Sequence, residues 1–319
     1  MTITANILKH SAQLAQSIGA RAIVVYADVF PDSVALSRFV EETGSIPVVL
    51  ATRGEGAEPP PDPSRVIRVP GIRLTRLGQI KVAVLLGFSR GLFARGDRLV
   101  CLSGIAGSGM VDTIVIMEVG EEFEMFAATG ATEVARHVNP EVFERVLDLA
   151  TTLGYEGREG KPVGTTFVIG DTERVLSLSR QMVLNPFKGY PEEERNILDP
   201  ALEETVKEFA AIDGAFVLRG DGQIEAAGVY LKPGAVGEIL PRGLGARHES
   251  AAGITAVTDA VAITVSESTG TVTVFQAGKI LIELERPRPI GPWTPQEGRS
   301  FPGLRGTGPA PRPEQPRNG

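Results

Sequence analysis

Short, mainly apolar runs separated by helical patterns constrain the fold of the first half of this chain more than any other feature. Ala22–Tyr26, Ile46–Leu50 and Arg98–Leu102 are typical of buried parallel strands. A helical pattern ends at Gly19 before the first run, and a second one, Val34–Glu42, follows it. This alternation predicts an open α/β sheet.

Two more elements continue this alternation: a helix around Gln79–Gly91 and a strand at Thr113–Val119. The Gly-, Pro- and Glu-rich stretch Thr52–Ser64 is typical of an exposed loop. We predict that residues 1–128 form this first domain. The glycine-rich segment Ser103–Gly109 is either a phosphate or effector loop or a structural turn, since it matches neither the P-loop nor the dinucleotide-binding pattern.

The second half predicts a mixed-sheet α/β domain over residues 129–284. A helical stripe over Glu141–Leu153 precedes a strand, Thr165–Ile169, and Ser266–Gly270 joins two β-rich runs as a hairpin turn would. The remaining predicted elements are a helix at Leu198–Phe209, a helix beginning near Arg247, and strands at Ile212–Leu218, Ile224–Tyr230 and Ala260–Ser266. From residue 285 to 319 the chain is rich in Pro, Gly and Arg, which predicts a disordered tail.

Charge and cysteine content narrow the class of protein. The 319 residues carry a net charge of −7, which argues against general nucleic-acid binding. The single cysteine, Cys101, lies in an apolar run and is interpreted as a buried strand residue rather than a reactive thiol. The apolar stretches are far shorter than the roughly 20 residues of a bilayer span. We therefore expect a soluble, cytoplasmic protein without a membrane partner.

Three short motifs between residues 213 and 267 carry residues suited to phosphate or metal chemistry. Asp213-Gly-Ala215 opens an apolar strand, and its carboxylate is either a turn residue or a catalytic group. Gly243–Ser250 places Arg247 and His248 near a helix start, either as a phosphate site or as a solvent-facing pair. Glu267, after Ser266, either faces a metal or begins an exposed turn.

The three histidines do not form a metal site by spacing. His10, His137 and His248 are isolated from one another in the sequence, so we do not expect a zinc triad.

Taken together, these motifs resemble the diadenylate cyclase domain over roughly Phe143 to Leu284. The resemblance rests on many short motifs in order: Leu153–Asp171, Asn185–Gly189, Ile212–Ala215, Gly228–Leu231, Gly245–His248, Thr258–Ala260 and Ser266–Gly270. The first half is similar to the α/β domain at the C-terminus of pyruvate kinases over Ile18–Val25, Ile46–Val49 and Gly96–Gly104. This pairing is similar to the archaeal DacZ type of diadenylate cyclase.

The resemblance implies an enzyme that condenses two ATP molecules into cyclic di-AMP, with the sites of two protomers face to face. Asp213 would then act on the 3′-hydroxyl and, with Glu267, hold Mn²⁺ or Mg²⁺. Arg247 and His248 would complete the catalytic set at the phosphates. The resemblance further implies nucleotide contacts from Gly214, Ala215, Leu231, Gly245, Ala246, Ser250 and Ser266.

Two departures from the family pattern keep a second interpretation open. The family often has Gly-Thr-Arg-His-Arg where this chain has Gly245-Ala-Arg-His-Glu249. Ala246 lacks a hydroxyl, and Glu249 replaces a cation, so we expect Glu249 to point away from the triphosphate. The alternative is a nucleotide-binding regulatory module with weak or no turnover. A third interpretation is an interaction scaffold that acts through the Pro- and Arg-rich tail.

Overall fold

A computed structural model describes most of the chain, in six segments: residues 3–30, 33–43, 46–54, 65–120, 137–232 and 245–286. Contacts unite Met1–Pro287 in one compact unit that contains two separate sheets. The domain boundary predicted at residue 128 and the tail beyond residue 286 lie outside the described residues.

The first sheet has five strands in the order β3-β2-β1-β4-β5. Its strands are β1 (Ala22–Tyr26), β2 (Val48–Thr52), β3 (Val66–Arg68), β4 (Arg98–Gly104) and β5 (Val111–Glu118). The pairs β1–β2 and β1–β4 are parallel, as the apolar runs predicted. The pair β2–β3 is also parallel, whereas β4 and β5 are antiparallel. Cys101 is fully buried in β4, which confirms its interpretation as a core residue.

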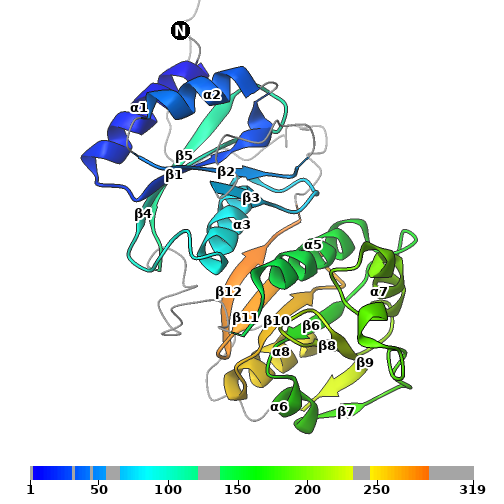
Figure 1. Cartoon of the computed structure of the whole chain (residues 1–319). Helices are drawn as coiled ribbons and strands as arrows, with labels where there is room; N and C mark the ends of the chain where they lie inside the picture. Colours follow the sequence, from blue (N-terminus) through cyan, green and yellow to red (C-terminus); the bar gives the residue numbers. More distant parts are fainter. Residues whose placement is uncertain are drawn as a thin grey trace, which may run out of the picture. The chain divides into compact units, whose positions relative to one another are not determined.

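Helices cover both faces of this sheet (Figure 1). Helices α1 (Ile3–Ser17) and α2 (Ser33–Glu42) lie on one side, and α3 (Arg76–Ser89) lies on the other. The glycine-rich segment Ser103–Gly109 joins β4 to β5, with no helix between these two strands. Two amides of that segment already bond backbone carbonyls: Gly107 N to Asp28 O at 2.7 Å and Gly109 N to Val29 O at 2.9 Å. These bonds favour a structural turn.

The second sheet has seven strands in the order β12-β11-β10-β6-β8-β9-β7. Only β6 and β8 pair in parallel, so the sheet is mixed, as predicted. Its strands are β6 (Thr165–Ile169), β7 (Ser179–Gln181), β8 (Ala215–Leu218), β9 (Ile224–Leu231), β10 (Val261–Val265), β11 (Val272–Gln276) and β12 (Lys279–Leu284).

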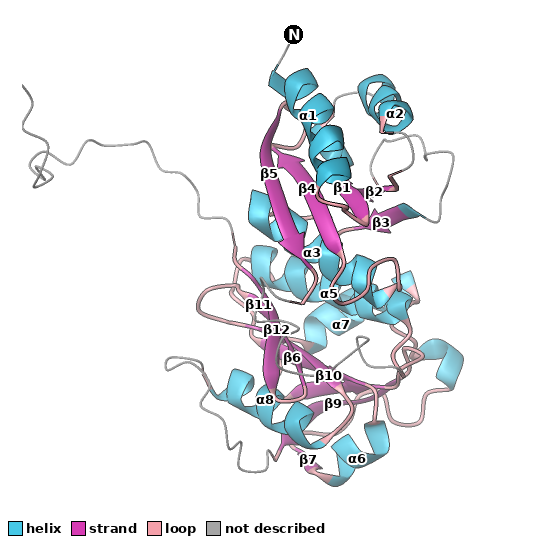
Figure 2. Cartoon of the chain, turned by 90° about the vertical axis from the view of Figure 1, so that its left-hand side faces the viewer, coloured by secondary structure: helices cyan, strands magenta, loops and turns pink. Residues whose placement is uncertain are grey.

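The central strand β6 is buried on both faces and separates two apolar layers. Alternate residues of a strand point to opposite faces. Phe167 and Ile169 accordingly pack in the layer that includes helix α5 (Pro140–Glu156), whereas Val168 packs with helix α8 (Ala246–Val257). Figures 1 and 2 show α5 and α8 on opposite faces of the sheet.

Two predicted elements begin later than expected, each for a local reason. The helix predicted from Leu198 is the short 3-10 turn Pro200–Leu202 followed by α7 (Glu203–Phe209). Asp199 precedes Pro200, and the helical conformation is disfavoured for a residue directly before a proline. The strand predicted from Ile212 begins at Ala215, because Gly214 has a left-handed φ of 117°. Helix α6 (Thr172–Ser177), β3 and β7 were not predicted, and neither were two 3-10 turns at Ala27–Val29 and Glu192–Glu194.

Helix α5 packs backbone to backbone against the turn between β10 and β11. The helix continues to Glu156, past the predicted end at Leu153, and so includes Gly154. A Cβ atom at Gly154 would lie 2.5 Å from the carbonyl oxygen of Gly270. Only glycine allows this approach, which supports the turn that carries Glu267.

We expect Gly154→Ala to destabilise the protein although alanine is the better helix former. Helix propensity favours alanine by about 1 kcal/mol, but the clash with Gly270 costs about 1–3 kcal/mol. Urea denaturation of the full chain should show a lower midpoint for this variant. Gly71→Ala is the matched control, because a Cβ there meets nothing within 4 Å. An unchanged or higher midpoint for Gly154→Ala would contradict the packing argument.

Candidate active site

Strand register brings three distant segments to one edge of the second sheet. Thr166 of β6 lies opposite Ala215 of the parallel strand β8. Strand β10 is antiparallel to β6, with Val265 opposite Thr165. The residues that precede β6 and β8 and those that follow β10 therefore meet at the same edge.

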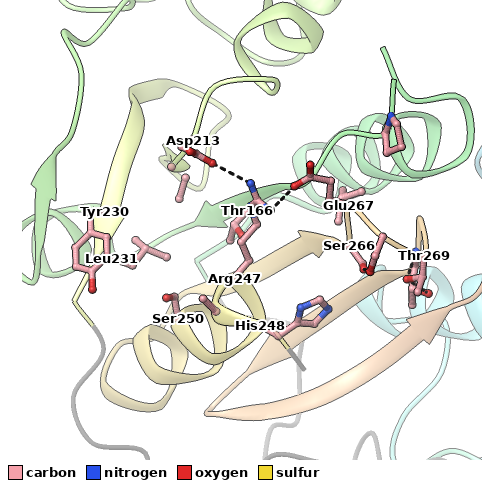
Figure 3. Close-up of a pocket in the computed structure, with 18 of the residues that line it drawn as sticks. Thr166, Asp213, Tyr230, Leu231, Arg247, His248, Ser250, Ser266, Glu267 and Thr269 are labelled. Atoms are coloured by element: carbon pink, nitrogen blue, oxygen red, sulfur yellow. Dashed lines mark hydrogen bonds and ion pairs between the residues drawn. The ribbon is translucent and has the colours of Figure 1, made fainter. Parts of the chain in front are cut away.

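A cavity of about 1050 Å³ lies at this edge (Figure 3). Every residue that the sequence analysis assigned to the site lines it: Asp213, Gly214, Ala215, Leu231, Gly245, Ala246, Arg247, His248, Ser250, Ser266 and Glu267. The structure therefore brings the whole predicted set together. The individual roles assigned to these residues stay predictions.

Asp213 occupies the bend directly before β8. The next residue, Gly214, has a φ of 117°, and a Cβ there would lie 2.6 Å from the backbone of Gly228 on β9. The two backbones thus approach too closely for any other residue type. This contact fixes the bend, and the Asp213 side chain stands 81% exposed at the cavity.

Arg247, in the first turn of α8, joins two of the carboxylates that line the cavity (Figure 3). Its Nη2 donates to Asp213 Oδ1 at 3.0 Å, and its Nη1 donates to Glu267 Oε2 at 3.1 Å. The guanidinium lies beside Gly164, where a Cβ would be only 2.6 Å from Arg247 Nη1. The missing side chain at Gly164 therefore makes room for the arginine.

The turn after β10 holds Glu267 in place. Ser266 N donates to Thr271 O at 2.9 Å, and Gly270 N donates to Ser266 O at 2.8 Å. The Ser266 and Ser268 hydroxyls are 3.3 Å apart. The predicted hairpin is confirmed, and its hydroxyls and carboxylate face the cavity.

The start of α8 presents small side chains to the cavity. Gly245 is the N-cap residue and has no side chain that could cap the helix. The first amides of a helix have no intrahelical partner and attract anions. Gly245, Ala246 and Ser250 leave access to this end of the helix, whereas Glu249 is exposed and does not line the cavity.

His248 is buried beneath the cavity rather than exposed in it. Only 6% of its surface is exposed, its Nε2 is 3.4 Å from Thr273 Oγ1, and its ring meets Phe275 edge-on at 6.0 Å. Burial, with a smaller contribution from the positive charge of Arg247, lowers the pKa of His248. The imidazole is therefore neutral near pH 7 and suits hydrogen bonding better than charge neutralisation.

The opposite end of the cavity is apolar. Leu231, at the end of β9, is buried, and Tyr230 beside it is half exposed. Tyr230 and Met182 were not predicted as site residues, nor were the other lining residues Pro162, Thr166, Val229, Val265, Ser268, Thr269, Thr271, Glu283 and Glu285. Five of them, Thr166, Val229, Tyr230, Val265 and Glu283, lie on strands, where the face that a residue presents depends on register and no local sequence signal marks it.

The charges in the cavity fit a metal only together with other ligands. The described part of the chain contains no group of three or more His, Cys, Asp or Glu placed to hold a metal. Asp213 and Glu267 supply two carboxylates. Mg²⁺ commonly binds one or two carboxylates and takes its remaining ligands from phosphates and water.

Two family models match the chain, one for each half. A model described as the DisA bacterial checkpoint controller nucleotide-binding domain matches residues 152–280. A model described as the probable sensor domain DacZ_P matches residues 4–126. The likeness of the first half to pyruvate kinase stays a prediction.

Curated relatives agree with these models. A diadenylate cyclase of Methanocaldococcus jannaschii is 40% identical over 178 residues, which cover 56% of this chain and 56% of that protein. A diadenylate cyclase of Haloferax volcanii is 35% identical over 212 residues, covering 65% of this chain and 75% of that protein. The chain belongs to the diadenylate cyclase family.

Solved structures include DacA from Staphylococcus aureus, at 24% identity and a TM-score of 0.31, covering 44% of this chain and 84% of that one. A hypothetical membrane-spanning protein of Bacillus cereus matches at 21% identity and a TM-score of 0.34, covering 48% of this chain and 65% of that chain. In the described part of the present chain, no helix has the length and apolar character to cross a membrane.

The lowered pKa of His248 predicts a pH-dependent stability. Its pKa in the folded protein lies below the unfolded value of 6.5, so the unfolded chain binds the proton more tightly. The unfolding free energy should therefore fall as the pH drops through about 6.5. We expect urea denaturation at a series of pH values to show that the unfolding free energy falls more steeply with decreasing pH for the wild type than for His248→Gln. Parallel profiles would show that His248 does not contribute.

Proposed function

We propose that this chain is a diadenylate cyclase that joins two ATP molecules into cyclic di-AMP. Each 3′-oxygen attacks the α-phosphorus of the other ATP, the bond to the β-phosphate breaks, and two pyrophosphates leave. The observation that carries the proposal is the single cavity in which Asp213, Arg247 and Glu267 meet. Family membership supports the same reaction.

The two ends of the cavity suit the two ends of ATP. Leu231 and Tyr230 offer apolar contacts to adenine. Arg247, Ser250 and the first amides of α8 suit the phosphates, because helix starts and guanidinium groups bind anions. Neutral His248, which lies beneath the cavity, would form a hydrogen bond with the phosphates.

Asp213 and Glu267 would hold a divalent metal, Mn²⁺ or Mg²⁺. Such an ion neutralises phosphate charge and favours loss of the 3′-hydroxyl proton. Asp213 would orient that hydroxyl. Its 81% exposed side chain suits a group that acts on a nucleotide held by another copy of the chain.

One cavity of this kind holds one of the two nucleotides, so we propose a homo-oligomer with face-to-face cyclase sites. ATP as the substrate fits a cytoplasmic location. The weaker alternative is a regulatory module that binds ATP without turnover. Ala246, which lacks a hydroxyl at the start of α8, is the observation that favours it.

Replacing Asp213 by asparagine should abolish most product formation and leave the fold intact. The amide keeps the shape but loses the charge, and loss of a group that assists proton transfer costs about 10²- to 10⁴-fold in rate. Cyclic di-AMP is measured by mass spectrometry after incubation with ATP and Mn²⁺ or Mg²⁺. Asp221→Asn is the control, since Asp221 pairs with Arg219 outside the cavity. Equal rates for the two variants would remove Asp213 from the reaction.

We further propose that residues 1–128 form a regulatory or assembly domain and residues 129–284 the cyclase domain. The match of residues 4–126 to a probable sensor domain supports this division. The tail predicted from residue 285 lies outside the described residues beyond Arg286.

Deletion of residues 1–128 should change the cyclase rate, the oligomer size or both. The rate is measured by cyclic di-AMP production and the size by light scattering, each against the full chain. If both stayed at the values of the full chain, the proposed role of this domain would be wrong.

A further inference from the structure

The cavity contains far more negative than positive charge. Among the described residues that line it are four carboxylates, Asp213, Glu267, Glu283 and Glu285, and one guanidinium, Arg247. The triphosphate of ATP is itself strongly negative. A nucleotide would therefore enter this cavity only with a cation that neutralises part of that charge.

The one guanidinium already occupies the place that such a cation needs. Arg247 contacts Asp213 at 3.0 Å and Glu267 at 3.1 Å, and these are the two carboxylates assigned to the metal. Gly164 provides the space for this arrangement, since any side chain there would meet Arg247 Nη1 and the Cβ of Glu267. The arginine and a metal thus compete for the same two carboxylates.

The ion pairs of Arg247 are weak enough to exchange. The side chains of Arg247, Asp213 and Glu267 are 33%, 81% and 60% exposed. Exposed ion pairs of this kind contribute on the order of 1 kcal/mol or less. A triphosphate offers the guanidinium new acceptors of higher charge at the same helix start.

We propose that Arg247 is a placeholder that exchanges partners when the metal and the nucleotide bind together. Without nucleotide, Arg247 neutralises Asp213 and Glu267 and weakens divalent-metal binding. With nucleotide, Arg247 turns to the phosphates and leaves both carboxylates to the metal. Metal and nucleotide therefore bind with positive coupling. This inference rests on the proposed nucleotide site.

The test is Mn²⁺ binding to the full chain without nucleotide. Binding is measured as the loss of the electron paramagnetic resonance signal of free Mn²⁺. Arg247→Ala should bind Mn²⁺ about tenfold more tightly than the wild type, within the usual range of coupling between two ligands. Arg247→Gln, which keeps most of the side chain, should give the same gain. Adding Asp213→Asn to either Arg247 variant should remove this gain in Mn²⁺ affinity.

Arg158→Ala is the matched control, because Arg158 also joins two carboxylates, Glu204 and Glu208, and its loss changes the net charge equally. Arg158 does not line the cavity. We expect no comparable gain in Mn²⁺ affinity for Arg158→Ala. An equal gain in this control, or unchanged or weaker Mn²⁺ binding by both Arg247 variants, would overturn the proposal.

A second arm uses an unreactive ATP analogue in the presence of Mn²⁺. The Arg247 variants should bind the analogue more weakly than the wild type, although they bind Mn²⁺ alone more tightly. Analogue binding at wild-type strength would contradict the transfer of Arg247 to the phosphates. Neither arm measures turnover. Failure to make cyclic di-AMP would contradict the proposed function, whereas the two binding measurements decide this inference separately.

Discussion

The pairing of β6 with β8 on one side and β10 on the other is the constraint on which the rest of the cyclase half depends. Because β6 and β8 are parallel and β10 is antiparallel to both, Gly164, Asp213 and Glu267 come to one edge of the sheet. A slip of one residue would exchange the two faces of a strand. It would move Phe167 away from α5 and dismantle the edge at the same time.

Glycines set the spacing within that framework. Gly214 allows β8 and β9 to approach, Gly154 allows α5 to touch the turn of Glu267, and Gly164 leaves room for the guanidinium of Arg247. Backbone contacts thus position Asp213 and the turn of Glu267, and the space at Gly164 accommodates the Arg247 side chain. The same contacts explain why exposed side chains such as Asp213 and Glu267 have defined positions.

Much of this architecture was predictable because its signals are local. The apolar runs Ala22–Tyr26 and Thr165–Ile169 are strands with the predicted bounds, and the hairpin after residue 265 lies where predicted. The strand β5 was predicted, but its antiparallel pairing with β4 was not, and neither was the short β7, since pairing partners are chosen by contacts distant in sequence. Arg247 was predicted as a phosphate ligand, but its bridge between two carboxylates depends on strand register. The burial of His248 depends on Thr273 and Phe275, which lie on another strand.

The proposed reaction of this cavity, the joining of two ATP molecules, has a defined product ratio. The most direct measurement is the product stoichiometry of the purified full chain incubated with ATP and Mn²⁺ or Mg²⁺, with nucleotides followed by mass spectrometry and pyrophosphate by an enzymatic assay. We expect cyclic di-AMP, with two pyrophosphates released for each molecule of cyclic di-AMP formed. A folded chain that binds ATP but releases neither product with either metal would contradict it.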